Sequence, residues 1–328
     1  MNDVAACLLY SSVVDRATAG LLGEARRLAD SLGSRLITII VGPAGAGVLD
    51  EAARVSESVI LADVPELSTY GVETTLNALT SICRHLNLRA VLMSNDCYGQ
   101  ELAGRLAYRL DGSSIGDVTT IEIQGESLKA TRSVYGGKAV AVVALEKFPA
   151  VIWLRARSFA PASRPVSPDA RVSAEVSNAL RDFPAESGPK IVESQGATSV
   201  EARLEDAAVI VSGGRGLGGP EPFEELKEIA RLLDAQVAAS RAACDAGWVP
   251  PSYQVGQTGK KVAPGLYVAV AISGASQHLA GISDAKVIAA INTDPDAPIF
   301  KHSAFGIVED FRKVLPLLKQ QLASRLSS

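Results

Sequence analysis

A glycine-rich segment of this chain has the spacing of a dinucleotide-binding loop. The apolar run Ala207–Ser212 leads directly into Gly213–Gly219, and a helix that begins with proline is expected next. Within the loop, Gly214-x-Gly216-x-x-Gly219 fits the dinucleotide pattern. Glycines let the backbone approach a ligand closely, and the start of a helix offers free N–H groups to an anion. Any tight strand-to-helix turn also favours glycine, so a purely structural turn is the alternative.

The residues around this loop argue against an ordinary NAD dehydrogenase. A conventional NAD-binding fold places Asp or Glu at the end of the following strand, where it holds the ribose hydroxyls. Here the strand expected at Gln236–Ala239 ends in Ser240 and Arg241. Arg215 also lies inside the loop, where a standard fingerprint needs no side chain.

A second group of small polar residues follows a later apolar run. The strand expected at Tyr267–Ile272 delivers Ser273–Ser276 at its carboxyl end, which is the edge where an open α/β sheet binds ligands. Hydroxyl and backbone N–H groups at the start of a short helix suit a pyrophosphate. A simple Ser-Gly junction between strand and helix is the alternative.

The elements that must position these groups begin with alternating strands and helices. Short apolar runs in the first hundred residues predict buried parallel strands at Ala5–Tyr10, Arg35–Val41, Ser58–Ala62 and Ala90–Ser94. Longer amphipathic runs predict helices at Ala17–Leu32, Val48–Val55, Val72–His85 and Gln100–Leu110. Repeated βα units of this kind predict a parallel sheet covered by helices on both faces.

The pattern then changes to strands with little helix between them, which we interpret as an antiparallel extension of the first domain. These strands are expected at Asp117–Ile123, Leu128–Val134, Ala139–Glu146 and Val151–Ala156. The dipeptides Gly125-Glu126 and Gly136-Gly137 are compatible with hairpin turns. From Ser158 to Gly188, Pro, Ser and Ala dominate, which predicts an interdomain connection.

A second βα series completes the chain. Its strands are expected at Ala207–Ser212, Gln236–Ala239, Tyr267–Ser273 and Val287–Ile291, and its helices at Pro222–Leu233 and Ile307–Leu322. The sequence therefore predicts an α/β protein of two domains, residues 1–190 and 191–328. Each domain is expected to contain a mainly parallel, doubly wound sheet, and the second is expected to be Rossmann-like.

The composition excludes several classes of function. The 328 residues are 47% hydrophobic, and the net charge of −4 gives no broad basic surface for nucleic acid. The most apolar runs, such as Ala139–Leu145, are strand-sized, so no membrane insertion is expected. The first ten residues resemble neither a secretory signal nor a transit peptide, which favours the cytoplasm.

Metal and hydrolytic chemistry also have little support. The chain has three histidines and four cysteines without a C-x-x-C pair, so no metal site is expected and the thiols are expected to be reduced. No Ser-His-Asp order, carboxylate dyad or general base beside a substrate pocket is identified. This pattern favours a carrier over a self-sufficient enzyme.

Several long motifs of the last third resemble one family closely. They are Gly213–Leu217, Ser240–Gly247, Val255–Lys260, Ala263–His278, Asn292–Phe300 and Phe305–Asp310. Together they resemble the α subunit of electron-transfer flavoproteins, a family that includes the nitrogen-fixation-associated and carnitine-pathway α subunits. The likeness spans Ala207–Leu318, and the first domain resembles the family's N-terminal domain more loosely.

The resemblance implies that FAD lies mostly on the second domain and that a separate β subunit completes the site. It also implies that electrons come from acyl-CoA-type dehydrogenases, as in fatty acid β-oxidation, and pass to a quinone reductase or similar acceptor. The family's flavin-contacting positions correspond here to Arg215, Ser240, Arg241, Val255, Gly256, Gln257, Thr258, Ser273, Gly274, Ala275, Ser276, Gln277, His278, Asn292, Asp310 and Phe311.

Four of these residues are implied to tune the flavin potential. The hydroxyl of Thr258 is implied to lie near the reactive nitrogen of the ring. His278 is implied to lie near the pyrimidine carbonyl, where a hydrogen-bond donor or an imidazolium stabilises negative charge. Arg215 and Arg241 would act in the same direction. The alternatives are a solvent-facing Thr in a glycine turn, a structural His and surface arginines.

Asn292 and Asp310 are expected to hold the adenosine end of the cofactor. Asn292 is equally suited to begin the Asn-Thr-Asp-Pro turn, and Asp310 to be an exposed helix acid. Two other functions are kept open. One is an electron-transfer subunit of a tight acyl-CoA or enoyl-CoA reductase or of a bifurcating complex, and the other is a non-redox nucleotide-binding module. The first domain has no feature tied to a ligand, and docking against the β subunit is its expected role.

Overall fold

The computed structural model describes residues 2–94, 96–135, 139–155, 158–163, 171–172 and 204–326. The chain divides into two compact units. The first contains the described residues of 1–133 and 140–196, and the second contains those of 134–139 and 197–328. Each unit is built on its own sheet. The predicted boundary between residues 190 and 191 lies outside the described residues, as does most of the predicted connection Ser158–Gly188, and both stay predictions.

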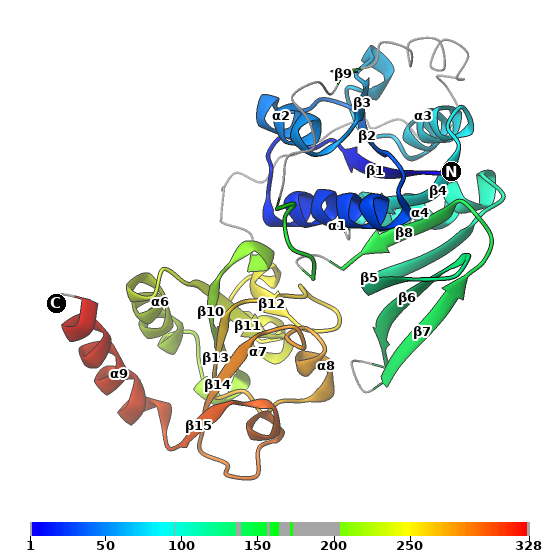
Figure 1. The fold of residues 1–328 in the computed structure, drawn as a ribbon. Helices are drawn as coiled ribbons and strands as arrows, with labels where there is room; N and C mark the ends of the chain where they lie inside the picture. Colours follow the sequence, from blue (N-terminus) through cyan, green and yellow to red (C-terminus); the bar gives the residue numbers. More distant parts are fainter. Residues whose placement is uncertain are drawn as a thin grey trace. The chain divides into compact units, whose positions relative to one another are not determined.

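The described strands of the first unit form one sheet in the order β7-β6-β5-β8-β4-β1-β2-β3-β9 (Figure 1). The strands are β1 (Asp3–Leu9), β2 (Leu36–Val41), β3 (Ser58–Ala62), β4 (Leu88–Met93), β5 (Ser113–Gln124), β6 (Ser127–Val134), β7 (Ala139–Leu145), β8 (Ala150–Leu154) and β9 (Arg171–Val172). β1 pairs in parallel with β2 on one side and with β4 on the other, so the chain reverses its direction of progress across the sheet between them.

Helices cover both faces of this sheet. They are α1 (Arg16–Leu32), α2 (Ala46–Val55), α3 (Val72–Arg84) and α4 (Cys97–Arg109), with a 3₁₀ turn η1 (Pro65–Leu67). The apolar faces of α1 and α2 belong to one buried cluster, and those of α3 and α4 to the cluster on the opposite face. The predicted doubly wound arrangement is therefore confirmed for the first unit.

One strand of the predicted antiparallel extension lies elsewhere. β5 and β6 form the expected antiparallel hairpin, with Gly125 at a φ of 58° in the turn. β8, however, pairs in parallel with both β4 and β5 and so lies inside the sheet. Its run of buried apolar residues is typical of a strand covered on both faces, and that pattern does not reveal the strand's direction.

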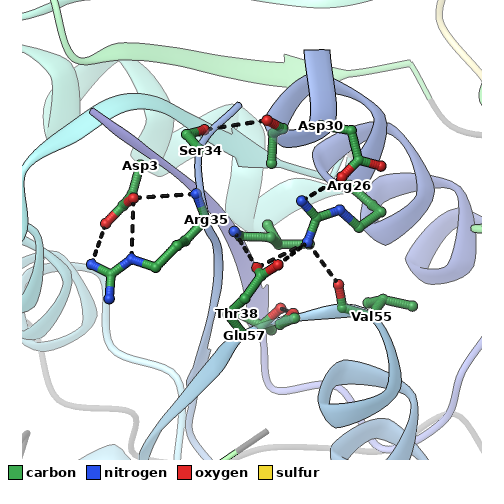
Figure 2. Close-up of polar contacts among 11 residues, drawn as sticks. Asp3, Arg26, Asp30, Ser34, Arg35, Thr38, Val55 and Glu57 are labelled. Carbon is green, nitrogen blue, oxygen red and sulfur yellow. Dashed lines mark hydrogen bonds and ion pairs between the residues drawn. The ribbon is translucent and has the colours of Figure 1, made fainter. Parts of the chain in front are cut away.

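Ion pairs hold the ends of the first strands in place (Figure 2). The Arg35 guanidinium lies 2.6 Å from the Asp3 carboxylate. Arg26, which is 6% exposed, donates to Glu57 at 2.8 Å. The Glu57 carboxylate also accepts from the Leu36 backbone N–H at 2.7 Å. Because Arg26, Arg35 and Glu57 are paired within the unit, their charges serve the fold.

The second unit contains an all-parallel sheet in the order β12-β11-β10-β13-β14-β15. Its strands are β10 (Val209–Gly213), β11 (Gln236–Ser240), β12 (Gln254–Val255), β13 (Leu266–Val270), β14 (Val287–Asn292) and β15 (Phe305–Val308). Its helices are α6 (Pro222–Leu232), α7 (Arg241–Asp245), α8 (Ser276–Leu279) and α9 (Phe311–Leu326), with 3₁₀ turns η3 (Leu204–Asp206), η4 (Arg215–Leu217), η5 (Pro251–Tyr253) and η6 (Pro298–His302).

Buried clusters lie on both faces of this sheet as well. α6, α7 and α9 contribute to one cluster, whereas the segments around α8 and η6 contribute to the other. Together the two units confirm the predicted α/β fold class. The helix predicted to start at Ile307 is wrong at its beginning: Phe305–Val308 pairs with β14 as an edge strand, and α9 begins at Phe311.

The described residues also bear on the excluded functions. No helix among them is long and apolar enough to cross a membrane. The same residues contain no cluster of three or more His, Cys, Asp or Glu side chains suited to a metal ion. Cys7, Cys83 and Cys244 are buried and Cys97 is exposed, and all four are free thiols.

Candidate functional site

A cavity of about 680 Å³ opens at the carboxyl edge of the second sheet. Its wall is formed by residues that follow β10, β11, β12 and β13 and by the last residues of β11, β12 and β14. β10 and β13 are neighbours from which the chain proceeds in opposite directions across the sheet. This is the topological switch point, where open α/β sheets bind ligands, and the volume is that of a cofactor pocket.

Most of the residues predicted to contact a cofactor are brought together by this cavity. Those that line it are Arg215, Ser240, Arg241, Val255, Gly256, Gln257, Thr258, Ser273, Ala275, Gln277, His278 and Asn292. Gly216, which belongs to the predicted dinucleotide pattern, also lines the cavity. The remaining lining residues were not predicted from the sequence, and they are Ala242, Asp245, Gln254, Ala271 and Ile272. Ala242, Ala271 and Ile272 lack polar side chains, so no chemical signal distinguishes them.

Four predicted residues lie outside the lining. Gly274 has a φ of +83°, and a Cβ there would lie 2.3 Å from the Ile299 amide nitrogen, so packing requires glycine. Ser276 is exposed on α8. The Asp310 carboxylate accepts from the Arg312 amide at 2.9 Å in the first turn of α9, and Phe311 is 5% exposed within an apolar cluster. Local structure thus accounts for Asp310 and Phe311.

The glycine loop contributes to the cavity differently from a conventional dinucleotide-binding loop. A Cβ on Gly214 would lie 2.1 Å from the Ala271 carbonyl oxygen, so this glycine allows the loop to pack on the end of β13. Only Arg215 and Gly216 of the loop reach the cavity wall, and no described residue of α6 does. The loop therefore presents a cation to the cavity, while the start of the following helix lies elsewhere.

The charged side chains of the wall are mainly cationic. Arg215 is exposed and makes no ion pair within the described part of the chain. The Arg241 Nε lies 3.3 Å from the Asp245 carboxylate, one turn along α7. One unpaired guanidinium and one paired guanidinium face a single cavity, which suits an anionic ligand.

His278 is the one histidine of the wall, and it is 7% exposed. Its Nε2 lies 3.0 Å from the Tyr267 hydroxyl, while its Nδ1 makes no hydrogen bond of standard geometry to any described residue. Burial lowers the pKa of His278 to about 4. Hydrogen bonding to the Val255 backbone raises the pKa and offsets only part of this effect. The side chain is therefore a neutral imidazole at neutral pH, so of the two predicted forms the structure favours the neutral donor over the imidazolium.

The loop around Thr258 is fixed by local contacts. The Gln257 amide donates to the Gln277 carbonyl at 2.7 Å, which ties the loop to α8. The Thr258 hydroxyl is exposed and accepts from the Gln254 side-chain amide at 3.0 Å. Gly256 has a φ of +148°, a conformation that side chains rarely adopt. These contacts place an oriented hydroxyl at the cavity wall.

Asn292 uses both side-chain polar atoms within the protein. Its Nδ2 donates to the Ile272 carbonyl at 3.0 Å, and its Oδ1 accepts from the Asp294 amide at 3.0 Å. It therefore begins the Asn-Thr-Asp-Pro turn and joins the ends of β13 and β14, although it also lines the cavity.

Two buried polar atoms on the wall make no hydrogen bond of standard geometry within the described residues. They are the Ser240 hydroxyl oxygen and the His278 Nδ1. A buried polar group left without a hydrogen bond costs roughly 1–3 kcal/mol, so such atoms mark a position for a ligand or water. With the two arginines, they describe a pocket for a ligand that has both acceptor atoms and negative charge.

Comparison with known proteins gives the same division of the chain. Residues 203–283 match the electron transfer flavoprotein FAD-binding domain, and residues 10–182 match the electron transfer flavoprotein domain. The first match contains most of the cavity wall, from Arg215 to His278.

Relatives align over most of their length. The electron transfer flavoprotein subunit alpha of Thermoanaerobacterium thermosaccharolyticum is 36% identical over 92% of this chain and 92% of its own. Protein FixB of Clostridium saccharobutylicum is 35% identical over 94% and 92%. The probable mitochondrial electron transfer flavoprotein subunit alpha of Caenorhabditis elegans is 39% identical over 80% and 77%.

Proposed function

The chain belongs to the electron transfer flavoprotein α-subunit family, and from this premise we propose that FAD binds in the 680 Å³ cavity of the second unit. There it accepts electrons from acyl-CoA-type dehydrogenases and passes them to a quinone reductase or a similar acceptor. The chain is an electron-carrier subunit with an FAD-binding domain. The donor, the acceptor and the residues in contact with the flavin are parts of the proposal.

The observation that carries this proposal is the chemistry of the cavity wall. FAD combines an anionic pyrophosphate with a flat ring that bears carbonyl acceptors. The wall offers Arg215 and Arg241 to negative charge, and the unpartnered His278 Nδ1 to an acceptor. Ser240 adds a hydroxyl without a partner. The residues present therefore fit the cofactor.

Bound FAD supplies the one-electron and two-electron redox chemistry, and the chain supplies its environment. Arg215 and Arg241 place positive charge beside the site, which favours electron uptake by Coulomb attraction. His278 offers a neutral donor, and Thr258 offers a hydroxyl held by Gln254. Ser273 and Ala275, which line the cavity, offer a hydroxyl and backbone amides to the pyrophosphate.

We further propose that a β subunit completes the site. The relatives are named as alpha subunits, which implies a partner chain. In this chain Thr258, Ser273 and Ala275 line the cavity yet are exposed. A flavin that rests only on such residues remains open to solvent, so the chain expressed alone is expected to be poorly soluble or weakly flavinated. A stable, fully flavinated monomer would contradict this part of the proposal.

Spectroscopy of the co-expressed pair tests the function. We expect a yellow complex with one FAD for each αβ pair, whose absorbance changes in two resolved one-electron steps during stepwise reduction. A second flavin in each pair, or a dehydrogenase that cannot be removed, would instead indicate a bifurcating or reductase complex. A colourless pair from flavin-replete cells would indicate a non-redox nucleotide-binding module.

A further inference from the structure

A buried tyrosine lies directly behind the cavity. Tyr267 is fully buried on β13, opposite Ile210 on β10 and Ile288 on β14. Because these surroundings are apolar, burial raises the pKa of Tyr267 far above its ordinary value. The phenol therefore keeps its proton, and a buried hydroxyl of this kind needs an acceptor for it.

Only one hydrogen bond of standard geometry joins this hydroxyl to a described side chain, and its partner is His278 Nε2 at 3.0 Å. Ser212 lies close enough to lower the pKa of Tyr267 against the larger effect of burial, but its hydroxyl makes no hydrogen bond of standard geometry within the described residues. If Nε2 carried a proton, the Tyr267 proton would have no acceptor of standard geometry among the described side chains. The geometry therefore makes Tyr267 the donor and Nε2 the acceptor.

This assignment fixes the position of the proton on the imidazole. A neutral ring that accepts at Nε2 carries its proton on Nδ1. Nδ1 is the ring nitrogen that makes no hydrogen bond of standard geometry within the described residues, and His278 lines the cavity. We propose that Tyr267 is a positioning residue that fixes the Nδ1-protonated tautomer of His278 and thereby presents a neutral N–H donor to the bound ligand.

The backbone holds the imidazole in this place. The His278 amide donates to the Ala275 carbonyl at 2.9 Å, and its own carbonyl accepts from Gly281 at 2.9 Å.

The other ionisable side chains of the described wall are Arg215, Arg241 and Asp245. The opposite tautomer would direct a lone pair at a carbonyl of the ligand. Tyr267 thus decides whether His278 attracts or repels that carbonyl.

The identity of the ligand rests on the proposed function, but the tautomer does not. Nitrogen-15 spectra of the histidine-labelled chain, co-purified with its β subunit, measure the tautomer directly. From about pH 6 to 8, around the ordinary histidine pKa, we expect His278 to show a protonated Nδ1 and an unprotonated Nε2. The same result is expected after removal of the flavin. A protonated Nε2, alone or in an imidazolium, would overturn the proposal.

Tyr267→Phe tests the consequence for redox chemistry because it removes the hydroxyl and keeps the ring. Without the Tyr267 hydroxyl, the His278 Nδ1–H is no longer fixed as a donor to the ligand. Loss of that hydrogen bond is expected to lower the equilibrium constant for uptake of the first electron by about threefold to tenfold. Tenfold corresponds to 59 mV for one electron. The matched control is Tyr108→Phe, which removes an exposed hydroxyl in the first unit and is expected to leave the potential unchanged.

A double-mutant cycle separates positioning from a general structural effect. In a His278→Gln background, Tyr267→Phe is expected to leave the reduction potential for the first electron unchanged, because Tyr267 acts through the imidazole. An equal shift in both backgrounds would overturn the proposal. A colourless preparation would contradict the proposed function, while the nitrogen-15 spectrum would still decide the tautomer.

Discussion

The two sheets of this chain differ at their switch points: tyrosine rings gather at the first, whereas a cavity opens at the second. In the first unit, β1 and β4 are neighbours at the switch point, and three tyrosines gather at their carboxyl ends. Tyr10 follows β1, and its ring lies 5.5 Å from that of Tyr70 and 5.6 Å from that of Tyr98. In the second unit, small residues such as Ser240 and Ala275 line the corresponding edge and leave the cavity.

The polar groups of the two edges differ as well. In the first unit, the Tyr10 hydroxyl is hydrogen-bonded to Thr75 at 3.0 Å, and Tyr70 donates to Glu101 at 2.8 Å. In the second unit, Ser240 Oγ and His278 Nδ1 lack described partners. Both units share the doubly wound architecture, so the architecture alone does not make a binding site. The size and the hydrogen-bonding state of a few residues at the switch point do.

A tyrosine placed in the second crevice is expected to have the largest effect on flavin binding. Ala275→Tyr puts a ring into the cavity from an exposed position, so the fold is expected to persist while the flavin is displaced. We expect flavin affinity to fall at least about a hundredfold, which is about 2.7 kcal/mol. The ratio of flavin to protein absorbance in the purified pair measures it.

The control for this substitution is Ala304→Tyr, at an exposed position outside the described cavity wall. It adds the same ring and is expected to keep the full flavin content. Retention of the flavin by both variants would show that the cofactor lies elsewhere.

Ionisation gives a second contrast, because the wall of the second crevice contains His278, whereas the aromatic groups described at the first crevice are tyrosines. The unfolded pKa of histidine is about 6.5, and burial lowers the folded pKa of His278 to about 4. Between these values the unfolded chain binds a proton that the folded chain does not. The contribution to stability is thus complete above pH 6.5 and is lost as the pH falls toward 4, by up to about 3 kcal/mol.

Denaturant unfolding of the pair at a series of pH values measures this loss, as the difference between the wild type and His278→Gln. The remaining ionisable groups are the same in both proteins, so their titrations cancel in the difference. An unfolding free-energy difference that stays constant from pH 7 down to 4 would contradict the neutral, buried state of His278.

In the first unit the tyrosines are expected to serve stability alone. Tyr10→Ala removes two ring contacts and the hydrogen bond to Thr75. We expect the free energy of unfolding to fall by about 2 kcal/mol, with no change in flavin content. Thermal unfolding with flavin quantification checks both. Loss of flavin without loss of stability would indicate that this crevice binds the cofactor.

The smallest expected effect concerns the cation in the glycine loop. Arg215→Gln removes a charge that has no described ion pair but keeps a polar side chain. The first-electron equilibrium constant is expected to fall by at most about tenfold, since the group is exposed and screened by solvent. Potentiometry at low and high salt measures it, and Arg312→Gln, on α9 outside the cavity wall, is the control. Equal shifts of the reduction potential in both variants would show that Arg215 has no local effect on the flavin.

The sequence predicts the alternation of strands and helices well, because apolar runs and amphipathic periods depend on local spacing. It does not predict that β8 lies between β4 and β5, since a buried strand looks the same in either direction. The start of α9 is missed because Phe305–Val308 is short and all its residues are exposed at the sheet edge. Such an edge strand carries no alternation to recognise.

The candidate site is likewise predicted from the sequence only in part. The residues that line the cavity come from loops after strands, and their motifs identify them. The lowered pKa of His278 depends on its burial. Its hydrogen-bond partner Tyr267 lies eleven positions earlier, in a strand that the sequence marks only as apolar. Gly214 and Gly216 of the loop are explained by packing on Ala271, a contact between segments far apart in the chain. Long-range contacts of this kind require coordinates.

The most direct test is a structure of the chain purified with its β subunit, with attention to the flavin density. It is expected to place the isoalloxazine ring against the second unit, with a ring acceptor within hydrogen-bond distance of His278 Nδ1 and Arg215 beside the ring. Flavin density on the first unit near Tyr10, or a second unit whose cavity holds no flavin in a yellow preparation, would contradict this assignment.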